Sequence, residues 1–416
     1  MDYFTYKNGE LYAEDVKISA LAEKYGTPLY VYSKATLVRH IEAFEASLKD
    51  RDHLVCFAVK ANGSLALLNL MAKLGAGFDI VSEGELRRVI AAGGDPKKVV
   101  FSGVAKTRQE IEFALRQQIR CLNIESYAEY RRVSEVAGAI GIRARIAFRV
   151  NPNVDAKTLP AISTGLKNNK FGIPIEEVLP VYKEAAADKN VIVSGIDCHI
   201  GSQMTSGFPI LEALDKLLIL YKDLQSSRIS IDHIDLGGGL GVTYDEETPP
   251  SPAEYFGAVK EKLSTVDSSV SIFIEPGRAM VANAGLLVTC VQYLKDNGSK
   301  HFCIVDAGMN DLIRPALYGS FMKIINSQDR QGEEQVYDVV GPVCESDDFL
   351  GKDRSLDVRQ GDILCVRGAG AYGSSMSSVY NGHPLCAEIL VDGDRDYVIR
   401  SRQSFEDMWK NEVIPE

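Results

Sequence analysis

The sequence predicts an α/β protein, a (β/α)8 TIM-type barrel combined with a second, mainly β domain. Eight short apolar runs occupy the first 280 residues with helical patterns between them, and polar residues gather just after those runs. After about residue 280, helical patterns become scarce. Buried parallel strands are continuous apolar runs, and barrel enzymes place functional residues at the carboxyl ends of strands. A doubly wound sheet also alternates strands and helices, but it seldom needs eight consecutive units.

The eight predicted strands are rich in β-branched residues and are bounded by Gly, Asn, Pro or Ser. They cover residues 54–59, 77–81, 98–102, 120–124, 144–150, 193–200, 233–236 and 271–275. Between them, apolar residues recur at helical spacing, for example over 65–74 and 211–221. We therefore expect the barrel to span residues 35–280.

The second domain is predicted at residues 281–416, where tight turns separate apolar segments. These segments are 284–294, 301–308, 335–343, 362–370 and 387–401. Near the N-terminus, Asn8-Gly9 predicts a hairpin, and residues 28–32 predict another strand. Short strands without a core need a partner sheet, so we expect the arm of residues 1–34 to join the C-terminal domain.

Composition and charge exclude several classes of protein. The chain has 416 residues and a net charge of −11, and it has no basic cluster, which argues against nucleic acid and anionic membranes as partners. No apolar run is long enough to span a bilayer, and the first residues do not resemble a signal peptide. The eight scattered cysteines form no CxxC pair. We expect a cytoplasmic protein with reduced cysteines and no zinc site.

Lys60 is the first candidate functional residue. It follows the apolar run LVCFAV, so it is expected to be close to buried and to need a partner. Desolvation lowers the pKa of an amine, which suits Schiff-base chemistry with a carbonyl cofactor. A lysine that extends from a strand end into solvent is the alternative, and position alone favours it.

Two further candidates follow the seventh and eighth strands. Gly237-Gly238-Gly239 would let backbone N–H groups approach an anion, although a tight turn explains the glycines about as well. In Glu275-Pro276-Gly277-Arg278, the acid could hold a protonated pyridine nitrogen and Arg278 could bind a phosphate or a carboxylate. A salt-bridged strand end is the alternative.

The remaining candidates give weaker signals. His199 could stack on a ring or move a proton, but a core histidine is commoner. Cys344 stands beside Glu345, outside a clean apolar run, although a lone cysteine is usually structural. The string Gly368–Gly373 matches the GxGxxG expression, but no βαβ pattern surrounds it, so it does not predict a dinucleotide site.

Together, nine motifs give a strong resemblance along nearly the whole chain. They are FAVKAN (57–62), GFDIVSEGEL (77–86), KFGI (170–173), CHIGSQ (198–203), DLGGGLGV (235–242), EPGR (275–278), DAGMNDLIRPALYG (306–319), GPVCESDDFLG (341–351) and GAYGSSMSSVYN (370–381). In these motifs the chain resembles the alanine-racemase-like, fold type III family of pyridoxal-phosphate decarboxylases, and among them those that act on diaminopimelate.

The resemblance implies that the cofactor is pyridoxal 5′-phosphate and that no metal is needed. Lys60 would bind the cofactor covalently, His199 would stack on its ring, and Glu275 would pair with the ring nitrogen. The residues implied in cofactor binding are Lys60, Asp79, His199, Ser202, Gly238, Gly239, Glu275, Pro276, Gly277, Arg278 and Tyr372.

For the substrate, the resemblance implies that Arg278, Arg314 and Tyr318 bind the distal carboxylate and that Glu345 binds the distal amine. Tyr372 would touch both cofactor and substrate. Cys344 would donate a proton from a partner subunit, which implies a homodimer with shared active sites.

The implied reaction converts meso-2,6-diaminopimelate to L-lysine and CO₂, the last step of lysine biosynthesis. Arg314 favours a substrate with a distal carboxylate, because it would stay a buried unpaired charge opposite a substrate that has only an amine there. A decarboxylase of D-lysine or D-ornithine is the alternative. A non-catalytic decarboxylase-like regulator is more remote, because Lys60, Arg278, Cys344 and Tyr372 are all present.

Overall fold

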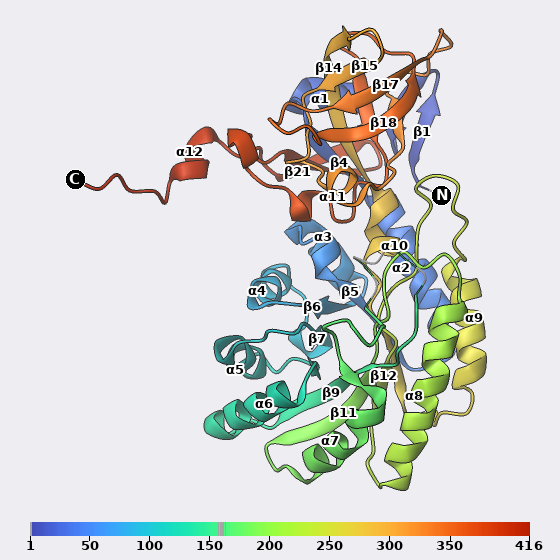
Figure 1. Cartoon of the computed structure of the whole chain (residues 1–416), viewed down its shortest axis with the longest axis vertical. Helices are drawn as coiled ribbons and strands as arrows, with labels where there is room; N and C mark the ends of the chain where they lie inside the picture. The colour runs from blue at the N-terminus through green and yellow to red at the C-terminus, as the bar shows by residue number, and fades with distance from the viewer. Residues whose placement is uncertain (1, 157, 159–161, 163) are drawn as a thin grey trace. The chain divides into compact units, whose positions relative to one another are not determined.

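The computed structural model describes residues 2–156, 158, 162 and 164–416, and it divides into two units (Figure 1). The barrel unit comprises His40–Val242 and Thr248–Ala279. The β-rich unit comprises the residues up to Arg39, Thr243–Glu247 and Met280–Glu416. The predicted fold class is confirmed, both in the barrel and in a β domain that combines the C-terminal region with the N-terminal arm.

Eight parallel strands close the barrel, because the last strand pairs with the first (Ile274 with Val55). The strands are β5 (His53–Ala58), β6 (Gly77–Ile80), β7 (Val99–Phe101), β8 (Cys121–Ile124), β9 (Ala144–Asn151), β11 (Val191–Asp197), β12 (His233–Asp235) and β13 (Ser271–Ile274). All eight lie within the predicted runs or differ from them by a few residues at their ends. A short strand that the sequence did not predict, β10 (Ile173–Pro174), pairs with β9.

Helices cover the outside of these strands, as Figure 1 shows. They are α3 (Leu65–Lys73), α4 (Glu83–Ala91), α5 (Arg108–Arg116), α6 (Tyr127–Ile140), α7 (Ile175–Ala187), α8 (Phe208–Ser226) and α9 (Pro252–Leu263), while α2 (Lys34–Leu48) precedes the first strand. Capping boxes begin two of them, Thr107 with Glu110 at α5 and Ser251 with Glu254 at α9. Each box satisfies backbone N–H groups that the first turn leaves without partners.

The β-rich unit contains two sheets and short helices. Its strands are β1 (Phe4–Lys7), β2 (Glu10–Ala13), β3 (Val16–Lys17), β4 (Leu29–Ser33), β14 (Gly285–Asp296), β15 (His301–Val305), β16 (Ile324–Asn326), β17 (Gln335–Val340), β18 (Phe349–Leu356), β19 (Ile363–Val366), β20 (Ala387–Asp392) and β21 (Arg395–Arg400). Its helices include α1 (Ile18–Tyr25), α10 (Arg278–Val281), which begins in the barrel unit, α11 (Arg314–Tyr318) and α12 (Phe405–Trp409). The larger sheet has the order β18-β17-β15-β14-β4-β20-β21.

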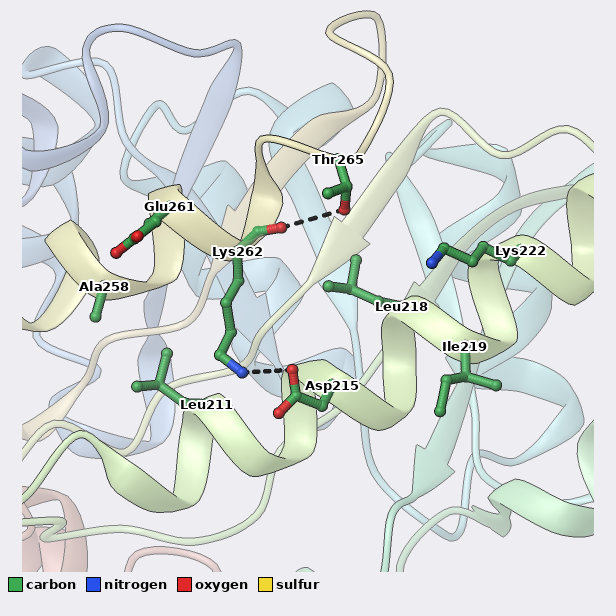
Figure 2. Close-up of a pocket in the computed structure, with 9 residues that line it drawn as sticks. All are labelled: Leu211, Asp215, Leu218, Ile219, Lys222, Ala258, Glu261, Lys262 and Thr265. Atoms are coloured by element: carbon green, nitrogen blue, oxygen red, sulfur yellow. Dashed lines mark hydrogen bonds and ion pairs between the residues drawn. The ribbon is translucent and has the colours of Figure 1, made fainter.

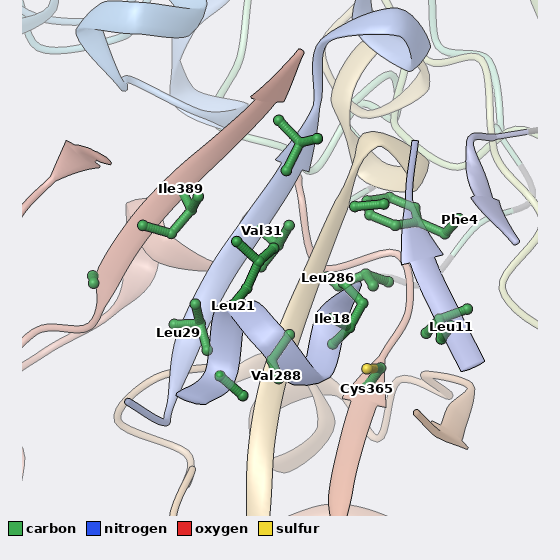
Figure 3. Close-up of a cluster of buried hydrophobic side chains, with 14 residues drawn as sticks. Phe4, Leu11, Ile18, Leu21, Leu29, Val31, Leu286, Val288, Cys365 and Ile389 are labelled. Atoms are coloured by element: carbon green, nitrogen blue, oxygen red, sulfur yellow. The ribbon is translucent and has the colours of Figure 1, made fainter. Parts of the chain in front are cut away.

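The N-terminal arm is an integral part of this unit. Asn8 and Gly9 turn the β1–β2 hairpin with φ angles of 53° and 79°, the geometry that the Asn-Gly pair predicts. Strand β4 lies between β14, to which it is antiparallel, and β20, to which it is parallel. Figure 3 shows the resulting core, in which Leu29 and Val31 of β4 contact side chains from both ends of the chain.

The sequence missed β16, β18, α1 and α11. The strand β16 has only three residues, and α11 has five, so neither shows a period. The segment 387–401 forms two strands, because Gly393 turns the chain with a φ of +63°. Among the residues that the structure describes, no helix is both long and apolar enough to cross a membrane.

Candidate active site

The candidate cofactor residues of the barrel unit all lie at or just beyond the carboxyl ends of its strands. Lys60 follows β5 in a single 3-10 turn (Val59–Ala61), and Asp79 lies in β6. His199 comes two residues after β11, because that strand ends at Asp197 and not, as the sequence predicted, at residue 200. The glycines follow β12 and Glu275 follows β13. The topology of a parallel barrel brings these ends together.

Lys60 has the partner that its position requires. Its Nζ donates to Oδ2 of Asp79 at 2.8 Å, and the Asp79 side chain is fully buried. The lysine side chain itself keeps 36% of its surface exposed, so it is paired at its amine but is not fully buried. A buried carboxylate can hold an ammonium group in one direction, which is what an amine that must reach a carbonyl carbon needs.

The ring of His199 is held as a neutral imidazole. Its Nδ1 accepts the backbone N–H of Gly238 at 3.0 Å, which leaves the proton on Nε2. Burial, with Arg149 and Lys60 nearby, holds the pKa of His199 well below its usual value. The carbonyl of His199 accepts from Thr164 Oγ1 at 2.8 Å and from Arg149 Nη2 at 3.3 Å. An uncharged, fixed ring is suited to stacking on another aromatic ring.

Gly237–Gly239 approach the eighth strand end more closely than other residues could. A Cβ atom on Gly238 would lie 2.3 Å from the carbonyl oxygen of Glu275. Gly237 and Gly239 have φ angles of +64° and +113°, which favour glycine. The next turn is also tight, although less so, since a Cβ on Gly277 would lie 3.1 Å from Ala58 Cβ. The tight-turn interpretation is therefore true of these glycines, and it is compatible with an anion site.

Glu275 belongs to a group of three buried carboxyls with Asp197 and Asp235, whose candidate ligand atoms lie within 4.8 Å of one another. Oε1 of Glu275 and one oxygen of each aspartate have no hydrogen-bond partner within the described chain. Burial, and then the neighbouring carboxyls, raises the pKa of Glu275 and of Asp197 well above the usual range. Burial raises the pKa of Asp235 to about 7. The group therefore retains protons near neutral pH.

Arg278 and Ser202 are the candidate anion-binding residues of the barrel unit. Nε and Nη2 of Arg278 both donate to Oγ of Ser202 at 3.2 Å. The guanidinium is buried, with 5% of the residue exposed. A buried guanidinium and a hydroxyl can together hold a phosphate or a carboxylate through charge-assisted hydrogen bonds.

Apart from Arg278, the candidate substrate residues lie in the β-rich unit. Arg314 begins α11 and is buried, with Nη1 donating to the hydroxyl of Tyr244 at 2.9 Å. Tyr318 ends the same helix and is half-buried. Tyr372 is also half-buried and has a φ of +54°, in the left-handed region that a tyrosine seldom occupies.

Cys344 and Glu345 lie in an exposed loop that other side chains fix. The N–H of Cys344 donates to Oδ1 of Asn381 at 2.7 Å, and the hydroxyl of Tyr380 donates to Oε1 of Glu345. Oδ2 of Asp348 accepts the N–H of Val343 at 2.7 Å just before the cysteine. The exposed thiol is thus presented from a fixed backbone, and the structural interpretation of a buried cysteine does not hold for it.

The barrel residues fit the cofactor that the resemblance implies. A protonated pyridine nitrogen would give the buried Oε1 of Glu275 the hydrogen-bond donor that it lacks. Ser202 and Arg278 can hold a phosphate, and Lys60 is an amine that can bind an aldehyde. The three clustered carboxyls are also close enough to one another to hold a cation.

Sequence reasoning missed several residues of this site. Asp197 and Asp235 lie inside apolar runs, and so does Arg149, which pairs with Glu125 at 2.9 Å in the interior. Their common signal is a charge within a predicted strand, which requires a partner on another strand. Tyr380, which holds Glu345, stands in the motif 370–381 but was given no role.

A groove elsewhere on the barrel unit contains none of the assigned residues. It lies between α8 and α9, has a volume of about 660 Å³ and is drawn in Figure 2. An ion pair between Lys262 and Asp215 crosses it, and Leu218 and Ile219 form an apolar part of its wall.

Comparison with known proteins shows extensive similarity. Residues 34–282 match the family model of the pyridoxal-dependent decarboxylases, pyridoxal binding domain. Diaminopimelate decarboxylase of Haemophilus influenzae is 54% identical over 410 residues, which are 98% of this chain and 99% of that protein. Diaminopimelate decarboxylase of Vibrio cholerae is 54% identical over 418 residues, with both chains fully covered.

A solved structure gives the same result. The crystal structure of diaminopimelate decarboxylase from M. jannaschii in co-complex with L-lysine is 36% identical and superposes with a TM-score of 0.95. The match covers 100% of this chain and 98% of that one.

Proposed function

The chain belongs to the pyridoxal-dependent decarboxylases, and we propose that it acts as a diaminopimelate decarboxylase, converting meso-2,6-diaminopimelate to L-lysine and CO₂. This is the last step of lysine biosynthesis. The observation that carries the proposal is the cluster of Lys60, His199 and Glu275 at the strand ends of a chain that matches such enzymes over its full length.

Pyridoxal 5′-phosphate, when bound, would supply an electron-withdrawing ring for the electron pair of the bond between Cα and the carboxylate. Lys60 would bind its aldehyde carbon, with the aldehyde oxygen leaving as water, and Asp79 would hold the lysine amine before that step. His199 would pack against the ring as a neutral imidazole, and Glu275 would hold a proton at the ring nitrogen. The phosphate would be held by Ser202, Gly238, Gly239 and the Glu275–Arg278 turn, which includes Pro276 and Gly277.

The substrate is bound by its distal groups. Arg314 and Arg278 receive the distal carboxylate with Tyr318, Glu345 receives the distal amine, and Tyr372 contacts substrate and cofactor. The buried Arg314 supports this assignment, because a guanidinium forms a forked contact with a carboxylate. It cannot form that contact with a substrate that has no distal carboxylate.

Cys344 donates the proton that replaces CO₂. Its S–H bond breaks and a C–H bond forms at the carbon from which the carboxylate departed, on the opposite face, which inverts that centre. The exposure of Cys344 and the fixed backbone of its loop support this role.

We further propose a homodimer in which Cys344 of one chain completes the active site of its partner. The enzyme works in the cytoplasm, in keeping with eight free cysteines, since thiols persist in reducing compartments. As domains we propose the arm of residues 1–34, the cofactor-binding barrel at 35–280, of which Thr243–Glu247 belongs to the β-rich unit, and the C-terminal domain at 281–416.

The experiment that tests the function compares substrates. We expect the purified, cofactor-loaded enzyme to release CO₂ from meso-diaminopimelate, with L-lysine as the other product, and to use D-lysine and L-ornithine far less well. A preference for D-lysine would favour the alternative decarboxylase. Absence of both a cofactor absorbance band and CO₂ release would instead indicate a non-catalytic regulator.

A further inference from the structure

We propose that Tyr244 is a positioning residue that fixes the guanidinium of Arg314 and thereby determines how strongly the enzyme prefers a substrate with a distal carboxylate. The inference rests on the proposed function, in which Arg314 receives that carboxylate. Tyr244 lies in Thr243–Glu247, a short segment between two stretches of barrel sequence that nevertheless belongs to the β-rich unit.

Tyr244 touches Arg314 in two ways. The phenol oxygen accepts Nη1 of the arginine at 2.9 Å, and the arginine Cζ lies 4.9 Å from the centre of the phenol ring. The same guanidinium contacts Oγ of Ser320 and Sδ of Met322, each at 3.5 Å. A phenol and a hydroxyl can orient a guanidinium through hydrogen bonds, and a cation over a ring face is further stabilised.

Gly368 also limits the position of the Tyr244 ring. A Cβ atom on this glycine would lie 2.9 Å and 3.0 Å from Cε1 and Cδ1 of the tyrosine ring, and its φ is +70°. Gly368 is the first glycine of the string that matches a dinucleotide-binding expression. Its position against the ring explains why a glycine stands there, and the absence of a side chain lets the ring approach the backbone closely.

The backbone beneath Tyr244 is fixed as well. The carboxylate of Glu247 accepts the N–H groups of Tyr244 at 3.0 Å and of Asp245 at 2.8 Å. Thr243 Oγ1 donates to the carbonyl of Glu247 at 2.8 Å. Burial alone would raise the pKa of Glu247, but these backbone donors lower it. The Glu247 side chain is therefore ionised near neutral pH and keeps these hydrogen bonds. Because the turn is fixed, the Tyr244 ring is held in one orientation against Arg314.

The consequence is specific to one class of substrate. A forked contact between a guanidinium and a carboxylate requires both groups in one plane, so a small rotation of Arg314 weakens both hydrogen bonds together. D-lysine has no distal carboxylate and does not use this contact. Loss of the Tyr244 hydroxyl should therefore weaken binding of meso-diaminopimelate and leave D-lysine little changed.

The test measures kcat and KM for both substrates in Tyr244→Phe, which keeps the ring and removes the hydroxyl. We expect kcat/KM for meso-diaminopimelate to fall about tenfold, mainly through a higher KM, and D-lysine to change less than about twofold. Gly368→Ala, which displaces the ring, should give the same selective loss. Tyr255→Phe is the matched control, since this equally buried tyrosine has a hydroxyl without a partner in the described chain.

Arg314→Ala, measured alongside, separates the two possible failures. If Arg314→Ala is selective for meso-diaminopimelate but Tyr244→Phe lowers both substrates equally or neither, the inference is wrong and the proposed role of Arg314 stands. If Arg314→Ala is not selective, the proposed role of Arg314 fails and the inference fails with it. The cofactor absorbance and the melting temperature of each variant should be unchanged, which would show that the variants are folded and loaded with cofactor.

Discussion

Lys60 combines a buried ionic partner with a side chain that is only partly buried. Its Nζ donates to Asp79, and 36% of its side-chain surface remains exposed. Covalent catalysis by lysine needs both, because the amine must be held in place and must also lose a proton before it can attack.

Replacing Lys60 by alanine should remove covalent cofactor binding. We expect the absorbance band of the bound cofactor to disappear and turnover to fall by at least about 1,000-fold, since both binding and exchange of the substrate amine need Nζ. Lys97→Ala, an exposed lysine of the same unit, is the control and should behave like the wild type. Near-normal turnover in Lys60→Ala would show that the barrel site is assigned wrongly.

Arg314→Ala should alter specificity more than catalysis. Removing the forked contact should cost meso-diaminopimelate at least about 2 kcal/mol of transition-state binding. The ratio of kcat/KM values should then shift toward D-lysine by more than about tenfold. Glu345→Gln should weaken both substrates, because both have the distal amine, and the exposed Arg359→Ala is the control.

Equal losses for the two substrates in a folded, cofactor-loaded Arg314→Ala would show instead that this arginine braces a loop. That outcome would remove the specificity assignment and leave the decarboxylase proposal intact.

Single residues could be predicted where a charge or a glycine ends an apolar run, as Lys60, Glu275 and Gly238 do. Asp197, Asp235 and Arg149 could not, because the partners that make a buried charge tolerable lie on other strands. Likewise, the nearness of Tyr380 to Glu345 depends on two loops of the β-rich unit that are far apart in sequence.

At the level of elements, α5 shows how local sequence determines where a helix starts. Thr107 Oγ1 accepts the N–H of Glu110 at 3.2 Å, and Oε2 of Glu110 accepts both the N–H and the hydroxyl of Thr107 at 2.9 Å. Burial would raise the pKa of Glu110, but these hydrogen bonds lower it. The capping box therefore contributes most when the glutamate is ionised.

Thr107→Ala should lower the free energy of unfolding by about 1 kcal/mol near neutral pH. Because the folded-state pKa of Glu110 is lowered, its contribution is present above the usual glutamate pKa and is lost as the pH falls through the folded value. The difference between wild type and variant should thus narrow below about pH 4. Denaturant titrations at several pH values measure this, with the exposed Thr205→Ala as control.

The long elements of the barrel could be predicted because each spans enough residues to show a period. Elements of a few residues could not, since β10 and β16 are strands only because they pair with β9 and β19. Strand β18 was missed for another reason. Its sequence has no apolar alternation, because its middle residues are charged or polar and mostly exposed, and its pairing with β17 holds it in the sheet.

At the level of the whole molecule, the proposed dimer predicts that two inactive variants can restore activity when mixed, which monomers could not do. Mixing Lys60→Ala with Cys344→Ala should restore about one quarter of the wild-type activity, because half of the dimers would be hybrids with one complete site each. The measurement is CO₂ release after subunits have exchanged. Each variant mixed with itself is the control, and failure to recover activity after proven exchange would mean that Cys344 serves its own chain.

The position of β4 between β14 and β20 also has a consequence for synthesis on the ribosome. About 350 residues separate β4 from β20, so at ordinary translation rates the ribosome makes β20 roughly 20–70 s after β4. All five residues of β4 are buried in the finished protein. During that interval the nascent chain carries an apolar strand with an unpaired edge, and we expect molecular chaperones to engage it while the barrel is already folding.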